Sequence, residues 1–241
     1  EFAEFIAEQI STSVNDISFW YIALFDLTPA SLLGHDQSLL TSGRLDNQVS
    51  CWAATEGLIA ASASEQSIDT ASVIALFDHE EVGSESTHGA SGPRLAWLLE
   101  ALHQGTRTEF HEALSRSHCI SADNAHALHP NYPDRHEPAH RPLPNLGPVL
   151  KVNANQRYAT SPESAAVFLQ TCDLAGVPHQ VFVSKNTMPC GSTIGPITST
   201  QLGIPTVDVG VAQLSMHSAR ELCGANDPAL LARVISRYFA A

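Results

Sequence analysis

Short apolar runs rich in β-branched or aromatic residues alternate along the chain with longer segments of helical period. This alternation is typical of α/β proteins, in which helices pack on a sheet. It predicts strands at Ile17–Phe25, Ser72–Phe77, Cys119–Ala122, Val149–Val152, Gln180–Val183 and Thr206–Val209. It predicts helices at Gln48–Ala63, Arg94–His103, Thr108–Arg116, Pro162–Ala175, Thr193–Leu202 and Pro228–Tyr238.

Capping residues mark several helix starts. Ser161 and Asp227 each offer a side-chain acceptor at the N-cap, and each is followed by a proline, which suits the first turn of a helix. Ser218 and Glu221 have the spacing of a capping box, which predicts a further helix beginning at Ser218 with His217 just outside it.

The stretch from Asn124 to Pro148 shows neither period and is rich in histidine and proline. We therefore expect a long loop there. Loops of this length inside a compact domain are usually functional or disordered, and this composition favours a rigid loop that forms part of a site.

Length and composition agree with one globular domain. The 241 residues are 44% hydrophobic and 15% charged, which is enough apolar content to bury a full core. The net charge of −13 repels phosphate backbones, so nucleic acid is disfavoured as a partner.

Cysteine usage and hydropathy favour a cytoplasmic protein. The five cysteines are odd in number, widely spaced and never in a Cys-x-x-Cys pair, which argues against a disulfide framework and against a thiolate zinc site. No apolar run reaches the roughly 18 residues that span a bilayer, so we expect no membrane partner. The first residues lack the basic start of a secretory signal, but a sequence that begins with glutamate can lack its natural start.

Acidic and imidazole residues gather where strands are expected to end, and ligands of open α/β sheets bind beyond the carboxyl ends of strands. The clusters are Arg44–Asn47, Phe77–Ser84, Ser121–His126 and Met216–Ser218. Each also has a structural interpretation: Asp46 can cap a helix, Asp123 can be a turn residue, and His126 can be an ordinary loop histidine.

The adjacent pair Glu80 and Glu81 is harder to explain structurally, because two carboxylates at the end of a buried strand repel each other unless a cation or a shared proton intervenes. Successive residues of an extended segment point to opposite sides. One glutamate can therefore hold a metal while the other faces a substrate water.

Aspartate, glutamate and histidine together form the ligand set of a hydrolytic zinc pair, because carboxylates can bridge two ions and imidazole favours zinc over calcium or magnesium. Two ions roughly 3.5 to 4 Å apart would activate a bridging water. The glycine-rich segment Pro189–Pro196 is not a phosphate loop, since it lacks the Gly-Lys-Ser/Thr ending. It is either a tight loop that approaches the substrate or an ordinary turn.

These residues fall within strings that resemble the aspartyl aminopeptidases of the two-zinc exopeptidase group. Seven strings follow the family order: Arg44–Asn47, Phe77–Ser84, Ala125–Tyr132, Gly147–Asn153, Gln156–Thr160, Cys190–Pro196 and Gln213–Ser218. The resemblance implies a three-layer α/β sandwich with a central mixed, mostly parallel sheet flanked by helices.

The resemblance also implies residue roles around two Zn²⁺ ions, with other divalent ions possible. Asp46 would bridge both ions, Glu81 and His217 would complete the protein ligands of one, and Asp123 would bind the other. Glu80 would be the general base. Substrate contacts would come from Glu80, Asp123, His126 and Lys151.

Two parts of the family pattern are not found in this sequence: an early His-x-Asp motif that supplies a further zinc ligand, and most of the inserted dimerisation domain that follows it. In Gly34-His35-Asp36 the aspartate is adjacent to the histidine, so this is not that motif. We expect residues 1–25 to be the tail of the inserted domain with a return strand. Residues 26–241 would be a zinc-peptidase domain incomplete on its N-terminal side, in a piece of a longer protein or in a degenerate relative.

Together these features predict a zinc aminopeptidase that removes N-terminal aspartate or glutamate from peptides, by attack of a metal-bridged hydroxide with Glu80 as general base. Lys151 is the candidate for the acidic side chain of the substrate, with Arg157 in reserve. The alternatives are the same chemistry with a neutral or hydrophobic preference, and an inactive metal-stabilised scaffold. The resemblance further implies a large homo-oligomer.

Overall fold

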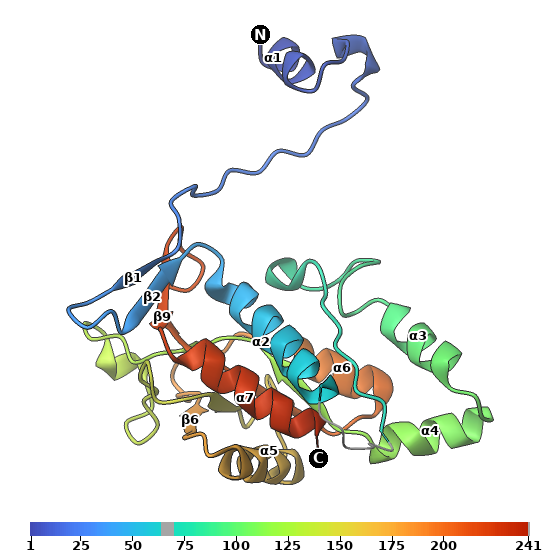
Figure 1. Cartoon of the computed structure of the whole chain (residues 1–241), viewed down its shortest axis with the longest axis vertical. Helices are drawn as coiled ribbons and strands as arrows, with labels where there is room; N and C mark the ends of the chain where they lie inside the picture. The colour runs from blue at the N-terminus through green and yellow to red at the C-terminus, as the bar shows by residue number, and fades with distance from the viewer. Residues whose placement is uncertain (64–69, 241) are drawn as a thin grey trace.

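The computed structural model describes residues 1–63 and 70–240. Within these residues the strands form two sheets, one of four strands and one of five, and helices pack around them (Figure 1). The expected α/β class is confirmed. No helix in the described part combines the length and apolar character required to cross a membrane.

The four-stranded sheet has the order β3-β7-β5-β6. Strands β3 and β7 are parallel, as are β5 and β6, whereas β5 and β7 are antiparallel. The sheet is therefore mixed and mostly parallel, as expected. Its strands confirm four of the predicted ones: β3 (Cys119–Ala122), β5 (Val149–Val152), β6 (Gln180–Val183) and β7 (Thr206–Gly210).

The five-stranded sheet has the order β1-β2-β9-β8-β4 and was not predicted from the sequence. Its strands are β1 (Ser31–Leu33), β2 (Leu39–Ser42), β9 (Glu221–Gly224), β8 (Ala212–Leu214) and β4 (Ala125–His126). The sheet joins segments that are far apart in the sequence. Strands β2 and β9 pair antiparallel, from Leu39 opposite Gly224 to Ser42 opposite Glu221.

The six helices predicted from the helical period are present, with small shifts at their ends: α2 (Leu45–Ser62), α3 (Arg94–Leu102), α4 (Arg107–Arg116), α5 (Pro162–Ala175), α6 (Ile194–Leu202) and α7 (Asp227–Phe239). Helices α2 and α7 lie side by side over the body (Figure 1). A Cβ at Gly57 would lie 2.7 Å from Ile235 Cγ2, so glycine permits this close packing. Phe168, Val209 and Leu231 are fully buried in the core beneath.

Two capping predictions have different outcomes. Ser161 caps α5 as predicted, because its hydroxyl accepts the Ser164 N–H. Asp227 does not cap α7: it is the first helical residue, and its carboxylate accepts the N–H groups of Asn145 (2.6 Å) and Gly147 (3.0 Å). Its side chain therefore ties the end of the histidine-proline loop to α7.

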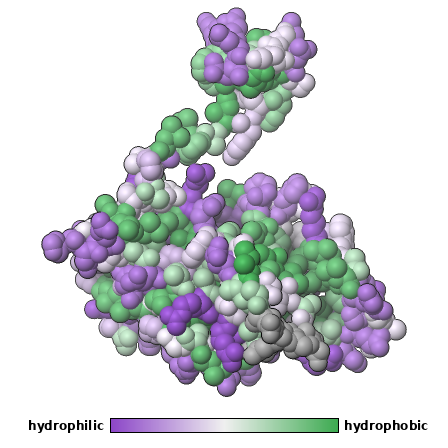
Figure 2. Space-filling model, in the orientation of Figure 1, coloured by the Kyte–Doolittle hydropathy of each residue, from purple (hydrophilic) through white to green (hydrophobic). Residues whose placement is uncertain are grey.

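Three other predictions are wrong. Ile17–Phe25 forms no strand: it belongs to an arm that carries α1 (Phe2–Gln9) away from the body, and Phe19 and Leu24 are 89% and 97% exposed. Figure 2 shows hydrophobic residues along this arm, where no neighbouring strand supplies hydrogen bonds. Ser72–Phe77 likewise pairs with no strand of the described part. No helix begins at Ser218, whose hydroxyl donates to the Arg220 carbonyl while the chain enters β9.

Candidate metal centre

The candidate ligands lie near strand ends, in a turn and in a short helix. Asp46 is at the start of α2 directly after β2, and Glu80 and Glu81 form the short 3-10 helix η2 (Glu80–Val82). Asp123 follows β3, and His217 lies in the turn between β8 and β9. The ends of both sheets thus contribute to one region.

The backbone at these turns is unusual. The φ angle is +57° at Arg44, +65° at His79 and +62° at His217. Non-glycine residues rarely adopt this left-handed region, and those that do concentrate at functional sites. Each of the three is a candidate ligand or lies within two residues of one.

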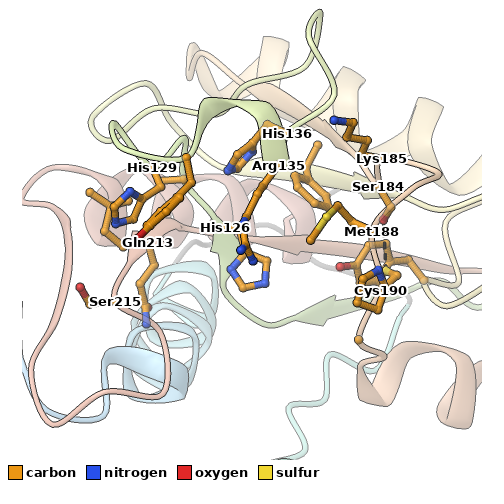
Figure 3. Close-up of a pocket in the computed structure, with 17 residues that line it drawn as sticks. His126, His129, Arg135, His136, Ser184, Lys185, Met188, Cys190, Gln213 and Ser215 are labelled. Carbon is orange, nitrogen blue, oxygen red and sulfur yellow. Dashed lines mark hydrogen bonds between the residues drawn. The ribbon is translucent and has the colours of Figure 1, made fainter.

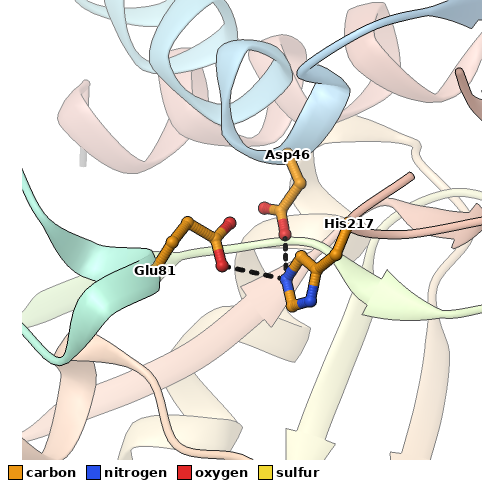
Figure 4. A group of neighbouring side chains, drawn as sticks. All are labelled: Asp46, Glu81 and His217. Carbon is orange, nitrogen blue, oxygen red and sulfur yellow. Dashed lines mark ion pairs between the residues drawn. The ribbon is translucent and has the colours of Figure 1, made fainter. Parts of the chain in front are cut away.

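Asp46, Glu81 and His217 converge (Figure 4). His217 Nε2 lies 2.9 Å from Glu81 Oε2 and 3.4 Å from Asp46 Oδ2, and the potential donor atoms of all three residues lie within 4.8 Å of one another. Two carboxylates and an imidazole are ligand chemistry that suits zinc.

Asp46 provides a test of whether this group fits a metal. Its side chain is 4% exposed, and its Oδ1 is buried without a hydrogen-bond partner in the described part of the protein. Burial, followed by the negative charges of Asp123, Glu81 and Glu221, raises the pKa of Asp46 well above its usual value. A buried carboxylate with an unpaired oxygen among other carboxylates is costly unless a cation accompanies it, so the site fits a metal.

Asp123 lies beside this group but is held by another partner. The Lys151 ammonium donates to Asp123 Oδ2 over 3.0 Å and to the Asn124 carbonyl over 3.1 Å, and the lysine is 2% exposed. The charge of Asp123 still acts on Asp46 and Glu80, whose pKa values it raises. The structure thus brings three of the four expected ligands into one group and places the fourth against it, paired with a lysine.

Glu80 is half-buried next to these carboxylates. Burial, then the charges of Asp123 and Glu81, raises the pKa of Glu80 to about 7, while Lys151 and His217 act in the opposite direction. A carboxyl group with a pKa near neutrality can both accept and return a proton, which is what a general base that later acts as an acid requires.

A cavity of about 520 Å³ contains the His126 ring (Figure 3). Its wall includes Arg135 and Lys185, and none of its described lining residues is acidic, although the whole chain carries a net charge of −13. Burial, then the positive charge of Lys151, lowers the pKa of His126. Pro189, Cys190 and Gly191 also line the cavity, so the glycine-rich segment is part of its wall.

Asp208 holds that wall in place and was missed from the sequence. Its fully buried carboxylate accepts hydrogen bonds from the hydroxyls of Ser121 (2.7 Å) and Thr193 (2.6 Å) and from the Ala159 N–H (2.6 Å). A charged residue inside an otherwise apolar strand pattern was the available signal, since a buried charge needs partners.

Glu221 is a second residue of the site that was not identified from the sequence. Its buried carboxylate accepts the N–H of Asp46 and the N–H of His217, each over 2.8 Å. The spacing of Ser218 and Glu221 predicted that this glutamate caps a helix, but no helix begins at Ser218.

The chain resembles known proteins along its whole length. The family model described as "Aminopeptidase I zinc metalloprotease (M18)" matches residues 1–239. A probable M18 family aminopeptidase 2 of Mycobacterium tuberculosis is 47% identical over 247 residues, covering 100% of this chain and 57% of that protein. Its namesake in Streptomyces coelicolor is 46% identical over 237 residues, covering 97% and 55%. The chain spans about half the length of the curated relatives it matches.

Solved structures show the same fold. The crystal structure of prApe1 gives a TM-score of 0.91 at 30% identity, covering 99% of this chain and 51% of that one. A chain of the Ape4 and Nbr1 complex gives 0.87 at 36% identity, covering 99% and 47%. The S. cerevisiae mApe1 dodecamer gives 0.87 at 28% identity, covering 99% and 54%.

Proposed function

The chain belongs to the M18 family of zinc aminopeptidases, and from that premise we propose that the protein removes N-terminal aspartate or glutamate from peptides. The observation that carries a hydrolytic role is the convergence of Asp46, Glu81 and His217 from distant parts of the chain. The buried Asp46 Oδ1, which has no hydrogen-bond partner in the described residues, supports a cation at this position.

We assign Asp46, Glu81, Asp123 and His217 to hold two zinc ions. When bound, zinc supplies a Lewis acid that activates water and polarises the scissile carbonyl. Glu80 then accepts the proton of the attacking water at its carboxylate and returns it to the leaving amine. Its near-neutral pKa and its place beside the proposed ligands support this role.

The cavity supports an acidic preference. It has two permanent cations and no carboxylate among its described lining residues, which attracts an anionic side chain against the negative charge of the whole protein. Lys151 is not a lining residue but lies behind the wall. Its Nζ is 5.0 Å from the centre of the Tyr158 ring, which lines the cavity. An ammonium has three protons, and the hydrogen bonds to Asp123 and Asn124 occupy two; we propose that the third donates to the substrate carboxylate.

Metal analysis combined with a peptidase assay on Asp-, Glu-, Ala- and Leu-anilides tests the proposal. We expect zinc in the purified protein and turnover that is fastest on the two acidic substrates. Equal or faster turnover of the neutral substrates would favour the neutral-preference alternative, for which the apolar parts of the cavity wall would be responsible. Protein without zinc and without turnover would identify a scaffold.

We also propose that the complete protein is a homo-oligomer and that residues 1–25 belong to its dimerisation region. The exposed arm supports this, because its apolar side chains would otherwise remain in water. The dodecameric state of mApe1 gives a precedent in the family. A cytoplasmic location is proposed on the five scattered thiols.

A further inference from the structure

We propose that Glu221 is a positioning residue that fixes the distance between the Asp46 and His217 ligands by holding their main chains. The inference rests on the proposed function, because it concerns residues proposed to bind zinc. Glu221 Oε2 accepts the Asp46 N–H and Oε1 accepts the His217 N–H, both over 2.8 Å. One carboxylate therefore connects the main chains of two ligand positions.

The glutamate is itself firmly anchored. It begins β9, where it pairs with Ser42 of β2, and its carbonyl accepts the Thr41 hydroxyl over 2.9 Å. Its exposure is 2%. With the main chain fixed in the sheet, the side chain has little freedom, so its two oxygens define two fixed points for the turns that carry the ligands.

Both ligand positions need such support. Asp46 has non-helical backbone angles inside the first turn of α2, and His217 is in the left-handed region. Their N–H groups therefore lie outside the regular hydrogen bonds of helix or sheet, and the Glu221 carboxylate takes the place of those bonds. Without it, the β2–β9 ladder would still hold the ends of the two turns together, but neither N–H group would have this partner.

A carboxylate is required for this geometry. Glu221 forms no ion pair in the described part of the chain and adds negative charge beside Asp46, which is unfavourable by itself. A glutamine would remove that charge, but its amide has one oxygen and would turn an NH₂ group toward one of the two N–H donors. The need for two acceptors explains why a charged residue occupies a position that otherwise favours a neutral one.

The test measures zinc affinity, by competition with a chelating dye, in the complete protein and in Glu221→Gln, Glu221→Asp and Thr41→Val. Partners of metal ligands typically change metal affinity by roughly 10- to 100-fold. We expect that loss in both Glu221 variants, because aspartate keeps the charge but is too short to reach both N–H groups. Thr41→Val removes one anchor of Glu221 but leaves the β2–β9 ladder and both carboxylate hydrogen bonds, so it should lose less zinc affinity than either Glu221 variant.

Hydrogen exchange of the metal-free proteins gives a second readout. Peptides covering residues 44–48 and 215–219 should exchange faster in the Glu221 variants than in Thr41→Val. Parent-like zinc affinity in Glu221→Gln would overturn the inference. So would parent-like affinity in Glu221→Asp, which would assign the effect to charge, and this variant decides the matter if the glutamine protein does not fold. A parent protein that binds no zinc would instead overturn the proposed function, and the inference with it.

Discussion

Lys151 and Asp123 form a buried ion pair, with Nζ 3.0 Å from Oδ2 and the lysine 2% exposed. The pair joins a proposed zinc ligand to the residue that we expect to recognise the acidic side chain of the substrate. Under these two proposals one ammonium group couples metal binding to substrate selection, which makes Lys151 the most informative residue to replace.

Replacing Lys151 by methionine should lower kcat/KM for Asp- and Glu-substrates far more than for Ala- or Leu-substrates. Removing a charge that pairs with a desolvated carboxylate costs about 2 to 5 kcal/mol. The steady-state constants of the four substrates give the comparison, and Lys185→Met at the cavity wall provides the reference for general loss of positive charge. A uniform loss from Lys151→Met, with an acid-specific loss from Lys185→Met, would place the acid contact at the wall.

The two adjacent glutamates should respond differently to the same change. In Glu80→Gln we expect kcat to fall by roughly 100-fold or more with zinc content preserved, because a general base is lost while the ligands remain. In Glu81→Gln we expect zinc content itself to fall. Zinc-to-protein ratios measured beside turnover distinguish the two, and equal zinc loss in both variants would contradict the division of roles.

Gly195→Ala should destabilise the cavity wall. A Cβ there would lie 2.6 Å from Asp208 Cγ, and three hydrogen bonds prevent that carboxylate from moving aside. Overpacking of this kind costs about 1 to 3 kcal/mol of unfolding free energy. Gly191→Ala in the same segment is the matched control, because its Cβ would meet nothing within 4 Å. Denaturant unfolding should show a difference between the two variants; similar stabilities would mean that the wall relaxes freely.

Asp227 should make stability fall as the pH rises through the acidic range. Burial raises its pKa from 3.8 to about 6, against the opposing effect of the Asn145 and Gly147 N–H groups. A raised folded-state pKa means that the folded protein favours the protonated form, so the stabilisation is complete below pH 4 and is lost between about pH 4 and 6. At about 1.4 kcal/mol per unit, the loss is about 3 kcal/mol.

The measurement compares unfolding free energies of the parent and Asp227→Asn in a chelator, so that zinc binding does not contribute. Asparagine loses one of the two backbone hydrogen bonds at every pH, which shifts its stability by a constant amount. The stability of the parent relative to the variant should decline from pH 4 to 6 and then level off. A difference independent of pH would show that Asp227 titrates in the folded protein as it does in the unfolded chain.

The sequence predicted the parts of the molecule whose signals are local. The strands β3, β5, β6 and β7 are short, mainly apolar runs, and α5 carries its cap in the adjacent Ser161. The ligand candidates were visible because acidic residues follow apolar runs or stand at helix starts, although the run before Glu80 and Glu81 forms no strand. Asp46 and Glu81 could therefore be selected before any geometry was known.

The remainder depends on partners far away in the sequence. Strand β9 exists because β2 lies next to it, whereas Ile17–Phe25 has the composition of a strand but no neighbouring strand in the described structure. The capping-box spacing at Ser218 and Glu221 fits a turn as well as a helix. The use of the Glu221 carboxylate at Asp46, 175 residues earlier in the chain, follows only from the assembled sheet.

The pairing of β2 with β9 has a consequence for the order of events during synthesis. The Thr41 hydroxyl and the Glu221 carbonyl that it contacts are 180 residues apart, so the turns bearing Asp46 and His217 cannot meet until β9 has left the ribosome. Contacts of such separation form late, because the entropy of closing the intervening loop opposes them. Until β9 is synthesised, the carboxylates and the imidazole of the proposed site are therefore separate. We expect the metal ion to bind after the two strands have paired and not to direct their pairing.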